Sequence, residues 1–171
     1  EIEFEAKGKY EIDDDPATDG ALKEIYEVGY AFTARWKSAI FFEFEKEPGG
    51  QLKHEAVAWE KIIQLTEQGE SWADVGLYLD YEASVHSAGN NKVQAMLLLE
   101  KETGDFLHTA NIIFEKQVSG QNKDGLELEY ALRSKYRHRK ELEFGIEAFG
   151  GFGEVEDFAP RSEQKHYLGP V

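Results

Sequence analysis

The first twelve residues, EIEFEAKGKYEI, alternate between uncharged and charged side chains without interruption. Even-numbered positions from 2 to 12 carry no charge, and every odd-numbered position from 3 to 11 is charged. Successive side chains of a strand point to opposite faces, so the pattern predicts a strand with one uncharged and one charged face. In a water-soluble protein the uncharged face packs into a core. In a membrane barrel it contacts lipid, and the charged face lines the interior.

The same alternation recurs along the chain, and no segment has a convincing helical pattern. Ten strands are predicted, spanning residues 2–12, 22–37, 39–47, 52–66, 71–86, 92–102, 105–119, 124–137, 140–152 and 163–171. Five of them have an uncharged face six positions long. Eleven residues at about 3.3 Å each extend roughly 36 Å, which approaches the height of a lipid-facing band when the strand is tilted by about 45°.

The connections between the predicted strands differ in length. Odd-numbered connections such as DDDPATDGA, HSAGNN and SGQNKDG are longer, whereas even-numbered ones such as TGD and RHRK are short. Short turns at one end and longer loops at the other are typical of outer-membrane barrels, whose short turns are periplasmic. We therefore predict an all-β fold: a single domain over residues 1–171, forming an antiparallel up-and-down meander β-barrel of about ten strands.

Composition excludes several classes of protein. The chain has 34 acidic and 19 basic residues, a formal charge of −15, so nucleic acid is not an expected partner. It contains no cysteine, which excludes a thiolate nucleophile or a cysteine-ligated metal. No run of 18 apolar residues predicts a transmembrane helix, and no signal peptide is visible. No cofactor is expected.

Four stretches carry a resemblance to a known family: FTARWKSAIFFEFEKEPGGQL, VAWEKIIQLTEQGESWADVGLYLDYE, LLLEKETGDFLHTANIIFEK and EQKHYLGPV. They resemble a family of uncharacterised exported proteins of Gram-negative bacteria that are regarded as outer-membrane β-barrels. The likeness covers most of residues 22–171 and implies a bacterial outer-membrane location, but no active-site residues. Family members usually continue beyond the GPV segment with further strands, so the chain is also compatible with part of a larger barrel of about twelve strands.

Alternation assigns candidate residues to each face of the predicted barrel. The lipid-facing candidates are Phe4, Tyr30, Phe32, Leu77, Leu79, Tyr130 and Phe144. The lumen-lining candidates are Glu3, Glu5, Lys7, Lys9, Glu27, Arg35, Asp80, Glu82, Asn111, Glu115, Glu127, Glu129, Arg133, Lys135, Glu143 and Glu147. Both signs of charge occur among them, so they can pair across strands, which matters because an unpaired buried charge is costly.

Neither a metal site nor catalysis is expected. An acidic loop holds Asp13, Asp14, Asp15 and Asp19, but its spacing does not match a calcium-binding EF-hand, and a solvated turn is favoured. The five histidines form no H-x-H or H-x-x-x-H pair, so no local zinc site is predicted. His86 and Ser87 could form a hydrolase dyad only outside a strand, because adjacent strand residues point apart.

Two further sets of residues allow more than one interpretation. Thr109, Asn111, Glu115 and Gln117 share a face, and an interior hydrogen-bonded network is favoured over a binding site. Trp36, Trp59 and Trp72 fit a membrane-interface girdle, with Trp36 and Trp72 on the short-turn side, or equally a soluble core.

The expected function is that of a non-enzymatic outer-membrane β-barrel with a charged lumen. It would act as a passive channel for small polar solutes, or as a structural or docking protein, with outer-membrane lipid and other envelope proteins as partners. The alternative is a soluble, lipocalin-like β-barrel that binds a small apolar ligand in an interior lined by Phe4, Tyr30, Leu79 and Tyr130.

Overall fold

The computed structural model describes residues 1–86, 89–120, 125–139 and 142–171, which form one antiparallel sheet and contain no helix. In chain order the strands are β1 (Ile2–Tyr10), β2 (Leu22–Thr33), β3 (Trp36–Lys46), β4 (Lys53–Gln64), β5 (Asp74–Ser84), β6 (Lys92–Thr103), β7 (Phe106–Gln117), β8 (Glu127–Arg139), β9 (Leu142–Glu154), β10 (Asp157–Phe158) and β11 (His166–Pro170). Within the described residues, no helix is long and apolar enough to cross a membrane.

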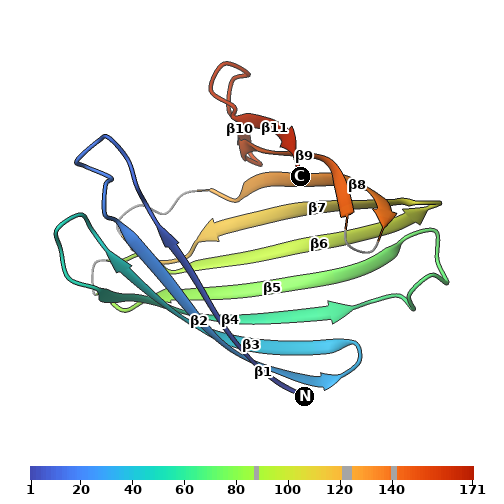
Figure 1. Ribbon diagram of the computed structural model, residues 1–171, viewed down its shortest axis with the longest axis horizontal. Helices are drawn as coiled ribbons and strands as arrows, with labels where there is room; N and C mark the ends of the chain where they lie inside the picture. Colours follow the sequence, from blue (N-terminus) through green and yellow to red (C-terminus); the bar gives the residue numbers. More distant parts are fainter. Residues whose placement is uncertain (87–88, 121–124, 140–141) are drawn as a thin grey trace.

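Each strand from β1 to β9 pairs with the next one in the chain, which confirms the predicted all-β antiparallel meander (Figure 1). The short strands β10 and β11 both pair antiparallel with the outer side of β9. β10 lies beside residues 153–154 and β11 beside residues 146–150, so the two strands share one position in the sheet. The sheet therefore has ten strand positions, and the last is interrupted at residues 159–165.

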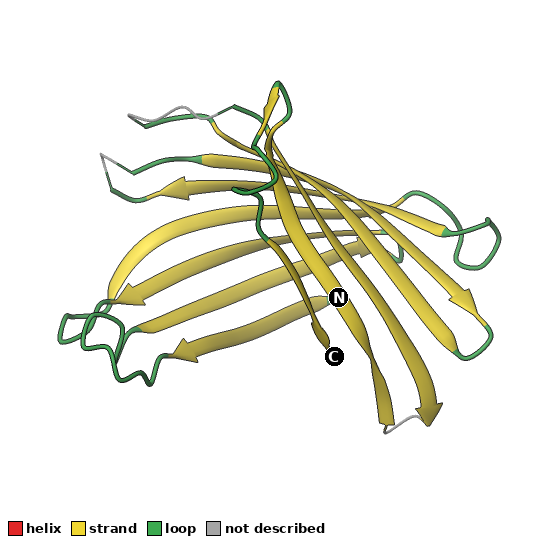
Figure 2. Ribbon diagram, turned by 90° about the horizontal axis from the view of Figure 1, so that it is seen from above, coloured by secondary structure: helices red, strands yellow, loops and turns green. Residues whose placement is uncertain are grey.

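The sheet curls but does not close (Figure 2). Within the described residues, the outer sides of β1 and β11 pair with no other strand. Because neighbouring strands alternate in direction, the first and tenth positions run antiparallel to each other. This is the relation that a closing pair needs in an up-and-down barrel with an even number of strands.

The structure corrects three predicted connections. The turn after β2 falls at residues 34–35 rather than around Ser38. A two-residue turn leaves the alternation of side chains uninterrupted on either side, so the sequence pattern did not reveal its position. The connection after β4 covers residues 65–73 and is longer than predicted, since β5 begins at Asp74. Hydrogen bonds from the Leu65 and Thr66 amides to the Val75 carbonyl fasten this connection to β5.

The ninth connection, GEVEDFAPRSE, was predicted to be one long loop, and instead it contains β10. A turn at residues 155–156 reverses the chain after β9, and Gly153 adopts a φ of 86°, a left-handed conformation that favours glycine.

Two short turns lie at one margin of the sheet: the turn at residues 34–35 between β2 and β3, and the turn at residues 104–105 between β6 and β7. Gly104 there has a φ of 59°. We call this end of the sheet the short-turn margin.

Candidate functional site

The pairing register separates two faces across the whole sheet. Partners opposite each other in a ladder share a face, as Leu79 and Ala95 do between β5 and β6. All seven lipid-facing candidates lie on the same face, which we call the apolar face. Every lumen-lining candidate except Arg35 lies on the opposite side, which we call the charged face.

The apolar face has exposed large side chains, and the charged face has two enclosed carboxylates among side chains that are otherwise partly or largely exposed. Large side chains of the apolar face stay accessible, with Phe4 78%, Tyr30 46% and Leu79 38% exposed. On the charged face, by contrast, Glu27 and Glu60 are only 7% and 8% exposed. Soluble monomers seldom expose a large contiguous apolar surface, and they seldom bury carboxylates unless these are paired.

Aromatic side chains gather at both ends of the apolar face. At the short-turn margin Phe32 stacks on Trp36 with ring centroids 4.4 Å apart, and Phe106 and Tyr136 are 5.1 Å apart. Toward the other margin Tyr130 and Phe152 are 5.5 Å apart. The opposite ends of the strands thus carry aromatic clusters, an arrangement that matches the interfacial girdles of membrane barrels.

The three tryptophans occupy different levels of the sheet. Trp36 begins β3 at the short-turn margin, and Trp72 lies in the connection between β4 and β5 at the same margin. Trp59 lies within β4, where its indole N–H donates to the Ser38 hydroxyl at 2.8 Å. Lys61 Nζ lies 4.3 Å from the Trp59 ring centroid. Only two of the three tryptophans therefore lie at a margin.

Ion pairs link strands across the charged face. Lys37 Nζ on β3 lies 2.7 Å from a Glu3 carboxylate oxygen on β1 and 2.9 Å from Glu27 Oε1 on β2. Lys23 on β2 pairs with Glu43 and Glu45 on β3. Near the short-turn margin, further pairs join Lys135 to Glu143 and Arg137 to both Glu102 and Glu143.

We expect Lys37→Met to destabilise the sheet by about 1–3 kcal/mol, because it leaves the enclosed Glu27 carboxylate without its cation. Lys9→Met is the matched control. Lys9 also pairs with a glutamate, Glu11, but its side chain is 73% exposed. Such surface ion pairs contribute about 0–1 kcal/mol to the free energy of unfolding. Urea midpoints of the two variants and the parent chain measure the difference. Equal midpoints for the two variants would show that the Lys37 cluster does not stabilise the fold.

A polar groove of about 490 Å³ crosses the charged face between β4 and β8. Its lining includes Ile62, Gln64, Leu98, Thr109, Asn111 and Arg133. Arg133 makes no ion pair with any residue that the structure describes, in contrast to Lys135 and Arg137. The groove therefore presents the Arg133 guanidinium beside a hydroxyl, an amide and the carboxylate residues Asp74 and Glu100, a combination that can form hydrogen bonds with a polar solute.

The predicted hydrogen-bonded network of Thr109, Asn111, Glu115 and Gln117 is found only at Glu115, which accepts a hydrogen bond from Gln94 Nε2 at 3.1 Å. Across the described part of the chain, the Thr109 and Asn111 side chains have no hydrogen-bond partner. Both face the polar groove. The network interpretation is therefore wrong for these two residues. Asn111 lies between Leu98 and Ala131, which offer no side-chain partner, and Thr109 lies between Glu100 and Arg133 without a hydrogen bond to either.

Arg35 is not a lining residue. It lies in the turn at residues 34–35, where its guanidinium pairs with Glu67 of the connection between β4 and β5. This ion pair joins two neighbouring turns at the short-turn margin. The displacement of Arg35 follows from the misplaced turn described above, which assigned residues 34–37 to the end of a strand.

Aspartates of the acidic loop at residues 13–19 accept hydrogen bonds from groups of the same loop. The Asp15 amide donates to Asp13 Oδ1 at 3.2 Å and the Thr18 hydroxyl donates to Asp13 Oδ2 at 3.1 Å; these bonds hold the pKa of Asp13 below its usual range. The Ala17 amide likewise donates to the Asp15 carboxylate. No group of three or more His, Asp or Glu side chains in the described residues is placed to hold a metal ion.

The proposed His86–Ser87 dyad cannot be placed, since Ser87 lies outside the described residues. His86 lies in the loop that follows β5, and its Nε2 is 2.8 Å from Glu55 Oε2 on β4. His86 therefore has a carboxylate partner on the neighbouring strand.

Sequence reasoning missed several residues of the charged face, among them Lys37 and Glu60. Lys37 was not assigned to a face because the misplaced turn put it at the end of a predicted strand. Glu60 was not assigned because Lys61 interrupts the apolar alternation of β4, so the sequence did not indicate which face each β4 residue occupies. In the structure Glu60 lies opposite Ala39 and Asp80. Comparison with known protein families, with curated proteins and with solved structures found no match for this chain.

Proposed function

We propose that the chain forms an outer-membrane β-barrel whose apolar face contacts lipid and whose charged face lines the interior. The observation that supports this most is that large side chains of the apolar face are accessible, whereas the Glu27 carboxylate, which pairs with Lys37, is enclosed on the opposite face. A lipid solvent stabilises the exposed apolar side chains, and the paired charges satisfy one another inside. The family resemblance described above points in the same direction.

The proposal requires that both edges of the sheet be paired in the membrane. Lipid offers no hydrogen-bonding partner to the open N–H and C=O groups of an edge strand, so spanning sheets close on themselves. The antiparallel relation between the first and tenth strand positions is compatible with direct pairing of β1 with β11. Further strands between the two edges would also satisfy this requirement.

Within such a barrel, we favour passive permeation of small polar solutes, with Arg133 opposing the cation preference of the carboxylates around it. Arg133 lines the polar groove together with Asp74 and Glu100, and it forms no ion pair with any described residue. Fixed charges that line a pore select ions by sign. A structural or docking role is the second candidate, because the other pairs on this face, such as Lys135 with Glu143, would obstruct a narrow interior.

The soluble, lipocalin-like alternative is less well supported. Its predicted ligand lining consists of Phe4, Tyr30, Leu79 and Tyr130, which all lie on the apolar face. Phe4 is 78% exposed, whereas a lipocalin ligand site encloses its lining residues within the barrel.

Membrane fractionation followed by gel electrophoresis tests the proposal. The chain, produced with an export signal in a Gram-negative host, is expected in the outer-membrane fraction and to resist extraction by alkaline carbonate. After extraction with mild detergent, unboiled and boiled samples should migrate differently, since a closed barrel resists unfolding by dodecyl sulfate. Recovery of the folded chain in the soluble fraction without detergent would contradict the proposal.

A further inference from the structure

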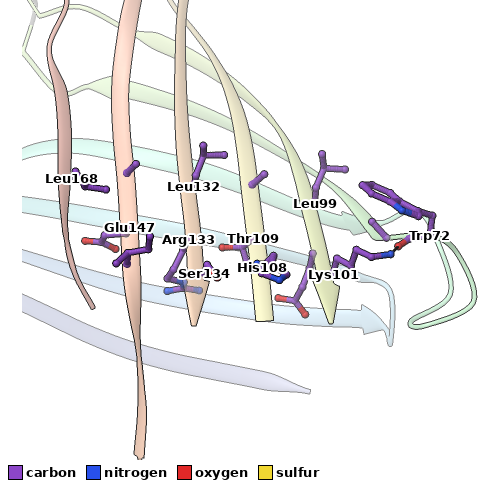
Figure 3. Close-up of a pocket in the computed structure, with 15 residues that line it drawn as sticks. Trp72, Leu99, Lys101, His108, Thr109, Leu132, Arg133, Ser134, Glu147 and Leu168 are labelled. Carbon is purple, nitrogen blue, oxygen red and sulfur yellow. Dashed lines mark hydrogen bonds between the residues drawn. The ribbon is translucent and has the colours of Figure 1, made fainter. Parts of the chain in front are cut away.

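A groove of about 530 Å³ lies on the apolar face near the short-turn margin (Figure 3). Its floor is a row of side chains in register across β6, β7, β8, β9 and β11, in the order Leu99, Ala110, Leu132, Ala148 and Leu168. Large and small residues alternate along the row. The two alanines leave the space that larger side chains would fill, so the row is hollow and apolar.

The neighbouring row, one step closer to the short-turn margin, is polar at the β6 end of the groove. Lys101, His108 and Ser134 stand side by side in register, and all three line the groove. Lys101 extends toward Trp72, with its ammonium 4.5 Å from the indole centroid (Figure 3). It also donates a hydrogen bond to the Trp72 carbonyl.

The Lys101 ammonium has no carboxylate partner among the described residues, although the chain carries a formal charge of −15. An ammonium has three donors, and the Trp72 carbonyl uses one of them. The Ser134 hydroxyl and a ring N–H of His108 add two donors in the same row. Together they match a phosphate diester, which carries one negative charge and accepts several hydrogen bonds.

We infer that this groove binds one anionic glycerophospholipid, with an acyl chain along the Leu99–Leu168 row and its phosphate at Lys101, His108 and Ser134. The inference rests on the proposed function, which places the apolar face in lipid and the short-turn margin at the membrane interface. Lysines at such an interface attract anionic headgroups, and the apolar row continues into the lipid-facing surface. The groove accordingly selects for both parts of one amphipathic molecule.

Native mass spectrometry of the detergent-purified full chain tests the site, with phosphatidylglycerol and phosphatidylcholine of identical acyl chains as probes. The parent chain should retain one phosphatidylglycerol, and at equal lipid concentration it should retain phosphatidylcholine several-fold less. Lys101→Gln should abolish this preference. Lys116→Gln is the matched control, because Lys116 lies on the apolar face of β7 near the opposite margin and should leave the preference unchanged.

A second variant tests the acyl-chain row independently of charge. Ala110→Leu fills the hollow and should reduce retention of both lipids, while the heat-dependent gel shift stays as in the parent chain. Equal lipid preference in Lys101→Gln and the parent, or an equal loss in Lys116→Gln, would overturn the inference. So would lipid-free dimers that Ala110→Leu dissociates, since a second copy would then occupy the groove.

The two proposals can fail separately. A chain that fractionates into the membrane but binds both lipids equally would overturn only the lipid site. A chain recovered in the soluble fraction that still prefers phosphatidylglycerol through Lys101 would overturn the membrane barrel and support the lipid site.

Discussion

Arginine in place of Leu79 is expected to prevent stable assembly in the membrane, with a cost of about 2–4 kcal/mol if the residue lies near the bilayer midplane. Leu79 lies in the interior of β5 on the apolar face and is 38% exposed. In lipid, the guanidinium would lose its hydration at this position. In water, a partly exposed leucine of an open sheet face tolerates arginine at a small cost. The same substitution therefore has different outcomes in the two media.

Glu82→Arg is the matched control, because Glu82 lies on the same strand but on the charged face, opposite Lys92 and Ala58. We expect this variant to reach the membrane fraction and to keep its heat-dependent gel shift. The yield of folded protein in the outer-membrane fraction measures both effects. Normal assembly of Leu79→Arg, or equal impairment of the two variants, would contradict the assigned orientation of the faces.

Arg133→Glu is expected to shift the ion preference of the purified protein in planar bilayers toward cations, by at least about tenfold in permeability ratio. A unit charge about 4 Å from a passing ion contributes about 1 kcal/mol in water, and the substitution reverses the sign of one such charge. The physical basis is the position of Arg133 in the polar groove without a carboxylate partner among the described residues.

Lys135→Gln is the control for charge at the same strand, since Lys135 is already paired with Glu143. It should change the permeability ratio less than the substitution at Arg133. A larger shift at Lys135 than at Arg133 would contradict the role of the groove. Silent bilayers that contain demonstrably folded protein would favour the structural or docking role over permeation.

Alternation of side chains was sufficient to predict the separation of the faces, because the twofold period of a strand depends only on local geometry. Phe4 and Leu79 lie far apart in the sequence, and their common face follows from the period of each strand together with the meander. The positions of turns were harder to predict. The turn at residues 34–35 preserves the alternation on both sides, so the sequence contained no local signal that distinguishes Trp36 at the start of β3 from Trp36 at the end of β2.

Features that run across strands could not be predicted from the sequence. The row from Leu99 to Leu168 and the cluster around Lys37 both depend on the stagger between neighbouring strands. Stagger is set by bulges and by connection lengths, such as the irregularity between Ala31 and Thr33 in β2. The split of the tenth position into β10 and β11 depends likewise on pairing with β9 rather than on any local pattern.

The interrupted tenth position also determines how a membrane would be crossed during insertion. With ten positions, β1 starts and β11 ends at the short-turn margin, beside Tyr30 and Ile146 respectively. The sheet can therefore insert as hairpins that leave both of these ends on the side of entry, while the connections at the opposite margin, such as residues 11–21 and 47–52, traverse the bilayer. Among these connections the loop at residues 11–21 is costly to move through the bilayer, because its aspartates must remain solvated or be neutralised while it crosses.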